Sequence, residues 1–180
     1  MKIHNGSLYW PTTTTPFTPK TTYEKLDIYD VVIVGSGMSG ALTALALAES
    51  GLKIAILDKR EMATGSSSAN TGLLQYSNDI MLHELIGQIG EKDAVRFYQL
   101  CYEAMDDLER VAKKLPNEVD FIRRPSICYA SDENDVEKIK AEYDTLTKYG
   151  FPCDYWGRNE MAEKMPFTKH GALVTHGDAE

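Results

Sequence analysis

The motif GSGMSG at residues 35–40 constrains the fold of this 180-residue chain more than any other feature. It follows an apolar run, DVVIVG (30–35), and opens an Ala- and Leu-rich segment (38–50) that is typical of a helix. A second apolar run, LKIAILD (52–58), comes next. Runs of this kind are typical of strands buried on both faces of a parallel sheet. The order predicts an α/β fold that contains a Rossmann-like βαβ unit.

The spacing of the three glycines matches GxGxxG, and each glycine has a physical role in that motif. Gly35 permits the tight turn from strand to helix, Gly37 lets a pyrophosphate approach the backbone, and Gly40 lets the helix pack closely on the strand. The N–H groups of Met38 and Ser39 lie at the positive end of the helix dipole. The motif therefore predicts that this turn holds the phosphates of a dinucleotide.

An acidic residue ends the second apolar run, about twenty residues after the glycines, where a ribose-binding carboxylate belongs. This residue is Asp58, and the predicted nucleotide site also includes the adjacent Lys59. An acid here favours a free ribose hydroxyl, and therefore NAD or FAD over NADP. The cations Lys59 and Arg60 leave NADP open, and the motif alone does not separate NAD from FAD.

The stretch ATGSSSANTGLLQ, residues 63–75, has two interpretations. Its first half has the composition of a flexible linker. Its second half ends in Asn-Thr-Gly-Leu-Leu, which a pure Gly/Ser linker has no reason to contain. Because it directly follows the nucleotide-binding pattern, we favour the hypothesis that it forms a wall of the site.

The sequence DVVIVGSGMSGALTALALAESGLKIAILDKR (30–60) resembles the N-terminal FAD motif of the D-amino-acid oxidase and glycine oxidase-like family. Ala44, Leu47, Ala48 and Gly51 stand where that family has small and apolar helix residues. The stretch GSSSANTGLLQ is similar to the family's Gly/Ser/Thr-rich loop in composition, length and place. The resemblance covers residues 29 to about 75 strongly, and the rest of the chain by order of elements.

The resemblance implies that the cofactor is FAD. It places Ser66 and Ser67 near the pyrophosphate, and Thr71, Gly72 and Leu73 along the isoalloxazine ring. It also implies oxidation of a small-molecule amine or amino acid by hydride transfer to the flavin. In that family an arginine in the later half of the chain grips the substrate carboxylate, and family members are roughly twice as long.

The remainder of the chain predicts three segments. Residues 1–28 are expected to be an extended N-terminal segment, 29–80 the FAD-binding βαβ unit with its flavin loop, and 81–180 a partial α+β substrate or cap domain. In the last segment we expect a helix over 79–90 that is interrupted near Gly87 and Gly90, and a longer helix over 91–115. We also expect either one strand bent at Pro125 or two short strands broken there, a helix from a Ser131 cap to Gly150, a helix over 159–164 and a strand over 171–176. We expect the whole to be an incomplete fragment of a longer enzyme.

Composition excludes several other classes of protein. A net charge of −8 argues against nucleic-acid binding, and no apolar run approaches the length of a membrane span. Three widely spaced cysteines without a CxxC pair are expected to be reduced thiols of a cytoplasmic protein, and no metal site is predicted. The four histidines are isolated, so the sequence identifies no catalytic residue, and it predicts no oligomeric state.

The leading hypothesis is therefore the N-terminal portion of an FAD-dependent oxidoreductase that oxidises an amine or amino acid. Two alternatives stay open. One is a truncated, non-catalytic remnant that binds a nucleotide. The other is a fragment of an NAD-dependent dehydrogenase, which the loop after Asp58 disfavours.

Overall fold

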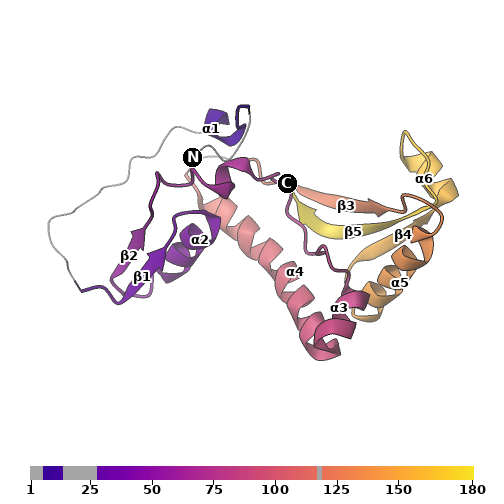
Figure 1. The fold of residues 1–180 in the computed structure, drawn as a ribbon, viewed down its shortest axis with the longest axis horizontal. Coiled ribbons are helices and arrows are strands. Elements are labelled where there is room, and N and C mark those ends of the chain that lie inside the picture. Colours follow the sequence, from indigo (N-terminus) through magenta and orange to yellow (C-terminus); the bar gives the residue numbers. More distant parts are fainter. Residues whose placement is uncertain (1–5, 14–27, 117–118) are drawn as a thin grey trace. The chain divides into compact units, whose positions relative to one another are not determined.

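The computed structural model describes residues 6–13, 28–116 and 119–180, and the chain divides into two compact units (Figure 1). The units comprise Met1–Thr71 and Gly72–Glu180. This division lies before the boundary predicted after residue 80. The segment between the two positions forms hydrogen bonds within the second unit. Leu74 forms an antiparallel bridge with Ala179, and the Tyr76 N–H donates to Asp178. The assignment of cofactor and substrate binding to separate domains stays a prediction.

The first unit contains the predicted βαβ arrangement. Strand β1 (Val31–Val34) leads into helix α2 (Met38–Leu47), and strand β2 (Ile54–Leu57) pairs with β1 in parallel. Helix α2 ends before residue 50, where Ser50 donates from its hydroxyl and its N–H to the Leu47 carbonyl. Gly51 follows with φ +78°, a conformation that favours glycine. The predicted α/β character of the chain is confirmed.

The expectation that both strands are buried on both faces is not met in this chain. Val34 is 87% exposed and Leu57 is 58% exposed. The physical reason is the size of the sheet, because the described residues supply two strands and a single helix packed against them. Such a unit covers one face of the sheet at most.

The N-terminal segment also differs from expectation where it is described. Residues Trp10–Thr13 form one helical turn, α1, instead of an extended chain. The indole N–H of Trp10 donates to the Asn70 carbonyl at 2.9 Å, directly after the short 3₁₀ helix η1 (Ser66–Ala69). The remainder of the segment predicted to be extended lies largely outside the described residues.

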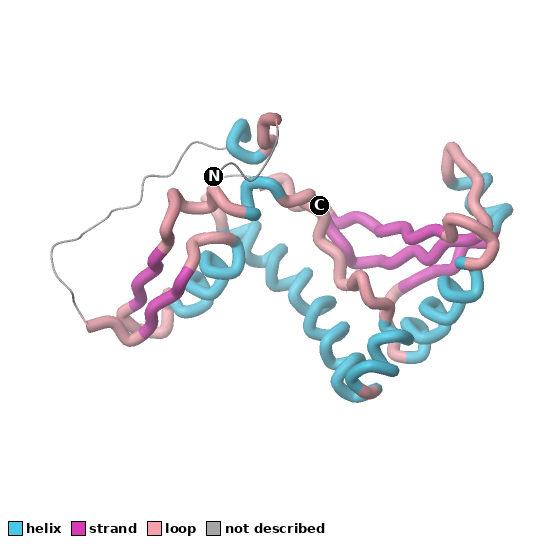
Figure 2. The backbone as a smooth tube through the Cα atoms, in the orientation of Figure 1, coloured by secondary structure: helices cyan, strands magenta, loops and turns pink. Residues whose placement is uncertain are grey.

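The second unit is an α+β arrangement around a three-stranded antiparallel sheet of order β3-β5-β4 (Figure 2). The central strand β5 is buried over most of its length. The elements, in chain order, are α3 (Leu82–Ile89), α4 (Glu91–Lys114), β3 (Arg123–Tyr129), α5 (Asp135–Lys148), β4 (Cys153–Gly157), α6 (Arg158–Lys164) and β5 (Gly171–Ala179).

Several local predictions for this unit are confirmed and others are wrong. The register of β3 with β5 shifts between Arg124 and Ser126, which places the predicted bend at Pro125. Ser131 does not cap α5. Its N–H donates instead to the Asp135 carboxylate, and the helix begins after Asn134. Strand β4 was not predicted, and β5 extends beyond residue 176.

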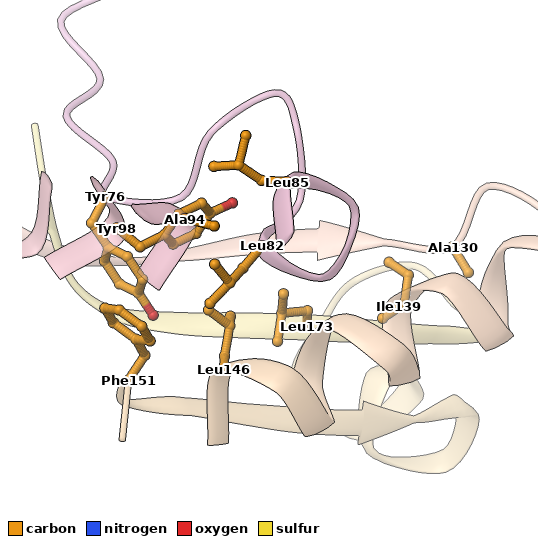
Figure 3. Packing of buried hydrophobic residues seen from close by; sticks show 10 residues of the cluster. All are labelled: Tyr76, Leu82, Leu85, Ala94, Tyr98, Ala130, Ile139, Leu146, Phe151 and Leu173. Atoms are coloured by element: carbon orange, nitrogen blue, oxygen red, sulfur yellow. The ribbon is translucent and has the colours of Figure 1, made fainter. Parts of the chain in front are cut away.

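An aromatic cluster forms one end of the core of this unit (Figure 3). Tyr76 stacks on Phe151 with ring centroids 5.7 Å apart, and Tyr98 meets Phe151 edge-on. Burial raises the pKa of the Tyr98 phenol, whose O–H donates to the Ile80 carbonyl at 2.8 Å. Tyr98 is therefore a packing residue. The other labelled residues of the core are Leu82, Leu85, Ala94, Ala130, Ile139, Leu146 and Leu173.

A buried carboxylate caps helix α3 from another helix. The side chain of Glu142, on α5, is 2% exposed and accepts the N–H groups of Leu82 and His83 at 2.8 and 3.0 Å. His83 Nδ1 lies 2.8 Å from the same carboxylate. The first N–H groups of a helix need such acceptors, and a buried charge needs such donors. Glu142 thereby joins α5 to α3.

We expect Glu142→Gln to lower the free energy of unfolding of this unit by roughly 1–3 kcal/mol, because one helix N–H then faces an amide NH₂ group. Urea unfolding measures the loss. Glu137→Gln is the matched control, since Glu137 lies on the same helix with its side chain 83% exposed. Equal stabilities of the two variants would contradict the capping role.

Candidate functional site

The turn between β1 and α2 requires glycine at its first and last motif positions. Gly35 has φ +101°, and its N–H donates to the Leu57 carbonyl at 2.7 Å. A Cβ atom added to Gly40 would lie 2.0 Å from the Gly35 carbonyl oxygen. Real Cβ atoms do not approach so closely, so glycine at residue 40 is what permits α2 to begin directly against the turn.

The N-terminus of α2 meets the small-residue loop that follows β2. Gly37 is the N-cap residue, and the Met38 N–H donates to the Ser67 hydroxyl at 3.0 Å. A Cβ atom on Gly37 would lie 3.1 Å from the same hydroxyl. Ser39 lies in the first turn of the helix. The structure therefore brings the glycine motif and the Ser67 region together around a helix N-terminus, an arrangement that favours anions.

Asp58 lies at the end of β2 and is bound to the same turn. Its Oδ2 atom accepts the Ser36 N–H and the Ser36 hydroxyl, both at 2.7 Å, and its Oδ1 atom accepts the Arg60 N–H at 2.9 Å. These hydrogen bonds, those from Ser36 first, lower the pKa of Asp58 to about 2. The exposed carboxylate is thus fully charged at neutral pH and acts purely as an acceptor.

The other residues that were predicted to bind the cofactor are divided between the two units. Lys59 is exposed beside Asp58, and Ser66 is exposed at the start of η1. Thr71 is the last residue of the first unit. Gly72, with φ +78°, and Leu73 belong to the second unit. The first unit therefore gathers the predicted phosphate and ribose residues, whereas the placement of Gly72 and Leu73 along a ring stays a prediction.

Sequence reasoning overlooked Ser36 as a functional residue. Its side chain is buried, with 6% of the residue exposed, and it is the hydroxyl that joins the turn to Asp58. A hydroxyl residue at the second position of the motif, with an acid at the end of the next strand, was the available signal. Ser68, which is also buried, holds the loop by donating to the Gly65 carbonyl at 2.7 Å.

Several charged side chains of the second unit form ion pairs within that unit. His176 Nε2 lies 2.8 Å from Asp154, and Arg123 bonds to Asp106 and Glu109. Within the described ranges, no group of three His, Cys, Asp or Glu side chains could hold a metal ion. Catalytic residues are not identified in this unit.

The donor set of the first unit fits the ADP half of a dinucleotide. A backbone without side-chain bulk at Gly37, N–H groups at the start of α2 and a charged acceptor at Asp58 suit phosphates and a ribose. The family described as FAD dependent oxidoreductase matches residues 30–180. This chain belongs to that family. The predicted family is thereby confirmed, and FAD is the family's cofactor.

Individual relatives agree with this assignment. The chain is 25% identical over 180 residues to the gamma-glutamylputrescine oxidoreductase of Escherichia coli, an alignment that spans 98% of this chain and 41% of that protein. Its fold is similar to glycine oxidase from Geobacillus kaustophilus, with a TM-score of 0.70, 23% identity, and coverage of 84% of this chain and 40% of that one.

A third similarity is to the L-amino acid deaminase of Proteus myxofaciens, with a TM-score of 0.68 and 16% identity. It covers 92% of this chain and 36% of that one. The chain thus spans about two fifths or less of the length of each of these proteins. In the part of the chain that the structure describes, no helix is long and apolar enough to cross a membrane.

We expect Gly40→Ala to destabilise the first unit by about 1–3 kcal/mol, because its Cβ atom would overlap the Gly35 carbonyl. Hydrogen exchange of the α2 amides measures this loss. Gly87→Ala is the matched control, since Gly87 lies inside α3 with nothing near its added Cβ atom and alanine is the better helix former. Unchanged protection of α2 in the Gly40 variant would contradict the close packing.

The lowered pKa of Asp58 predicts an acid-dependent loss of stability. Because the pKa in the folded state lies below the ordinary value of 3.8, the stabilisation is complete above that value and is lost as the pH falls toward 2. Urea unfolding of the first unit between about pH 5 and pH 2 should show this loss in the wild type and not in Asp58→Asn. Glu61→Gln, an exposed carboxylate change in the same loop, should keep the wild-type profile.

Proposed function

We propose that the protein is the N-terminal, FAD-binding portion of an oxidoreductase that oxidises a small-molecule amine or amino acid. The observation that carries the proposal is the contact between the α2 N-terminus and the loop after β2. The Met38 N–H and the Gly37 backbone face the Ser67 hydroxyl. Ser67 comes from the loop whose resemblance to a flavin loop distinguishes FAD from other dinucleotides.

Each residue of the site has a proposed task in holding FAD. The N–H groups of Met38 and Ser39, with the Ser66 and Ser67 region, bind the pyrophosphate. Asp58, beside Lys59, accepts a ribose hydroxyl. The glycine backbone at residues 35, 37 and 40 permits the close approach of the phosphates.

The loop residues Thr71, Gly72 and Leu73 are proposed to contact the isoalloxazine ring through their backbone. When bound, the flavin supplies an acceptor for the hydride that leaves the substrate carbon. Gly72 has φ +78°, so a residue with a side chain there would strain the backbone.

The substrate class rests on the relatives. The E. coli relative is named for gamma-glutamylputrescine and the structural neighbours for glycine and L-amino acids. Because the chain spans 36–41% of the length of these proteins, substrate binding and turnover are proposed for the whole enzyme. The proposal also places that enzyme in the cytoplasm.

The test begins with binding. The purified protein is titrated with FAD and, separately, with NAD, and flavin fluorescence and calorimetry report the dissociation constants. We expect FAD to bind and NAD to bind at least tenfold more weakly. In Gly37→Val, the added methyl groups would enter the phosphate approach, and FAD affinity should fall by more than tenfold.

Gly87→Val is the control for this change, because Gly87 has open space around its added Cβ atom. FAD bound at wild-type affinity by Gly37→Val would contradict the site, and binding of NAD without FAD would contradict the flavin assignment. Anaerobic addition of amines and amino acids to the flavin-loaded whole enzyme then tests turnover. Flavin binding by the whole enzyme without bleaching by any of these substrates would favour a non-catalytic nucleotide-binding protein.

A further inference from the structure

We propose that the Ser36 hydroxyl restricts Asp58 to a single hydroxyl of the nucleotide ribose, which makes Ser36 a specificity-determining residue. The inference rests on the proposed FAD site and goes beyond it, because it states how many ribose hydroxyls Asp58 binds. A ribose offers two neighbouring hydroxyls, and a carboxylate with both oxygens available could accept both.

The argument follows from the acceptor positions of one carboxylate. An ionised carboxylate offers about four lone-pair positions, two on each oxygen. Two donors from Ser36 occupy Oδ2, each at 2.7 Å, and the Arg60 N–H occupies one position of Oδ1 at 2.9 Å. Among the described residues, this leaves one acceptor position on Oδ1 without a donor. A single ribose hydroxyl can fill that position.

The burial of Ser36 makes this arrangement specific to its side chain. Any residue except proline at position 36 would present the same backbone N–H, but the second donor to Oδ2 is the serine hydroxyl. Only 6% of Ser36 is exposed, so its hydroxyl is held against Asp58 while the carboxylate itself stays exposed. Ser36 therefore acts on the ribose through Asp58, as a positioning residue.

The charge of the carboxylate defines the chemical class of the ligand. Asp58 stays ionised at neutral pH and can only accept hydrogen bonds. A ribose hydroxyl satisfies it, whereas a 2′-phosphate on the ribose would bring two negative charges together. The ligand is thus a nucleoside diphosphate, free or as part of a dinucleotide, with an unmodified ribose hydroxyl.

The decisive experiment compares ADP with 2′-deoxy-ADP and 3′-deoxy-ADP on the wild-type protein, by calorimetry or by displacement of FAD. We expect one deoxy analogue to bind as ADP does and the other to bind about tenfold or more weakly, because one hydrogen bond to a charged acceptor is lost. Equal weakening by both changes, or by neither, would overturn the inference.

A variant tests Ser36 itself and needs no bound ligand. In Ser36→Ala, a carbon-13 NMR titration should show the pKa of the Asp58 carboxyl moving from about 2 toward 3.8, and Ser36→Thr should restore the low value. The two deoxy analogues should also differ less from each other, while inorganic pyrophosphate binds as before. Ser50→Ala is the control, since its hydroxyl bonds to the Leu47 carbonyl at the far end of α2.

The outcomes separate this inference from the proposed function. If the wild-type protein binds neither FAD nor ADP, both fail. If it binds FAD and ADP but does not discriminate between the deoxy analogues, the site stands and the role of Ser36 falls. If Ser36→Ala does not fold, the analogue series on the wild-type protein still decides.

Discussion

The close approach between Gly40 and the Gly35 carbonyl is the constraint on which the first unit depends. A Cβ atom at residue 40 would lie 2.0 Å from that oxygen, so α2 can start directly above the turn only with glycine there. This fixes the helix N-terminus beside the end of β2. Once the helix starts there, the Ser36 backbone and hydroxyl reach Asp58, and the Met38 N–H reaches Ser67. The proposed phosphate and ribose positions follow from one steric requirement.

The second unit is organised differently, by buried carboxylates that satisfy backbone donors far away in sequence. Glu142 caps α3 from α5, and Asp178 on β5 accepts the Tyr76 N–H at 2.9 Å and the Thr175 hydroxyl at 2.6 Å. Each carboxyl group is buried and would be costly to bury without these donors. The hydrogen bonds from Tyr76 and Leu82 to these carboxyl groups hold the segment that follows the flavin loop against β5 and α5. Their role is structural.

Features that depend on neighbouring residues could be predicted from the sequence, whereas features that depend on distant residues could not. The βαβ unit and the long helix α4 were predictable because apolar periodicity and glycine spacing operate within a few residues. The cap at Ser131 was wrong because Asp135 competes for the same turn from four residues away. Strand β4 was overlooked since its sequence, CDYWG, mixes polar and aromatic residues and becomes a strand by pairing with β5. The Ser36–Asp58 bond joins residues separated by a helix and a strand, so the residue types in the sequence suggest the pair but only the structure shows the hydrogen bond.

The site also shows why the cofactor can be argued from this chain more firmly than the substrate. The phosphate and ribose contacts proposed for FAD come from one compact unit, from backbone groups and two side chains whose hydrogen bonds are defined. Recognition of a substrate needs a charged or polar group directed at it. In the second unit, Arg123, His83 and His176 are paired with carboxylates of their own unit. Nucleotide binding and substrate choice are therefore separable properties here, and the former can be measured before the latter is known.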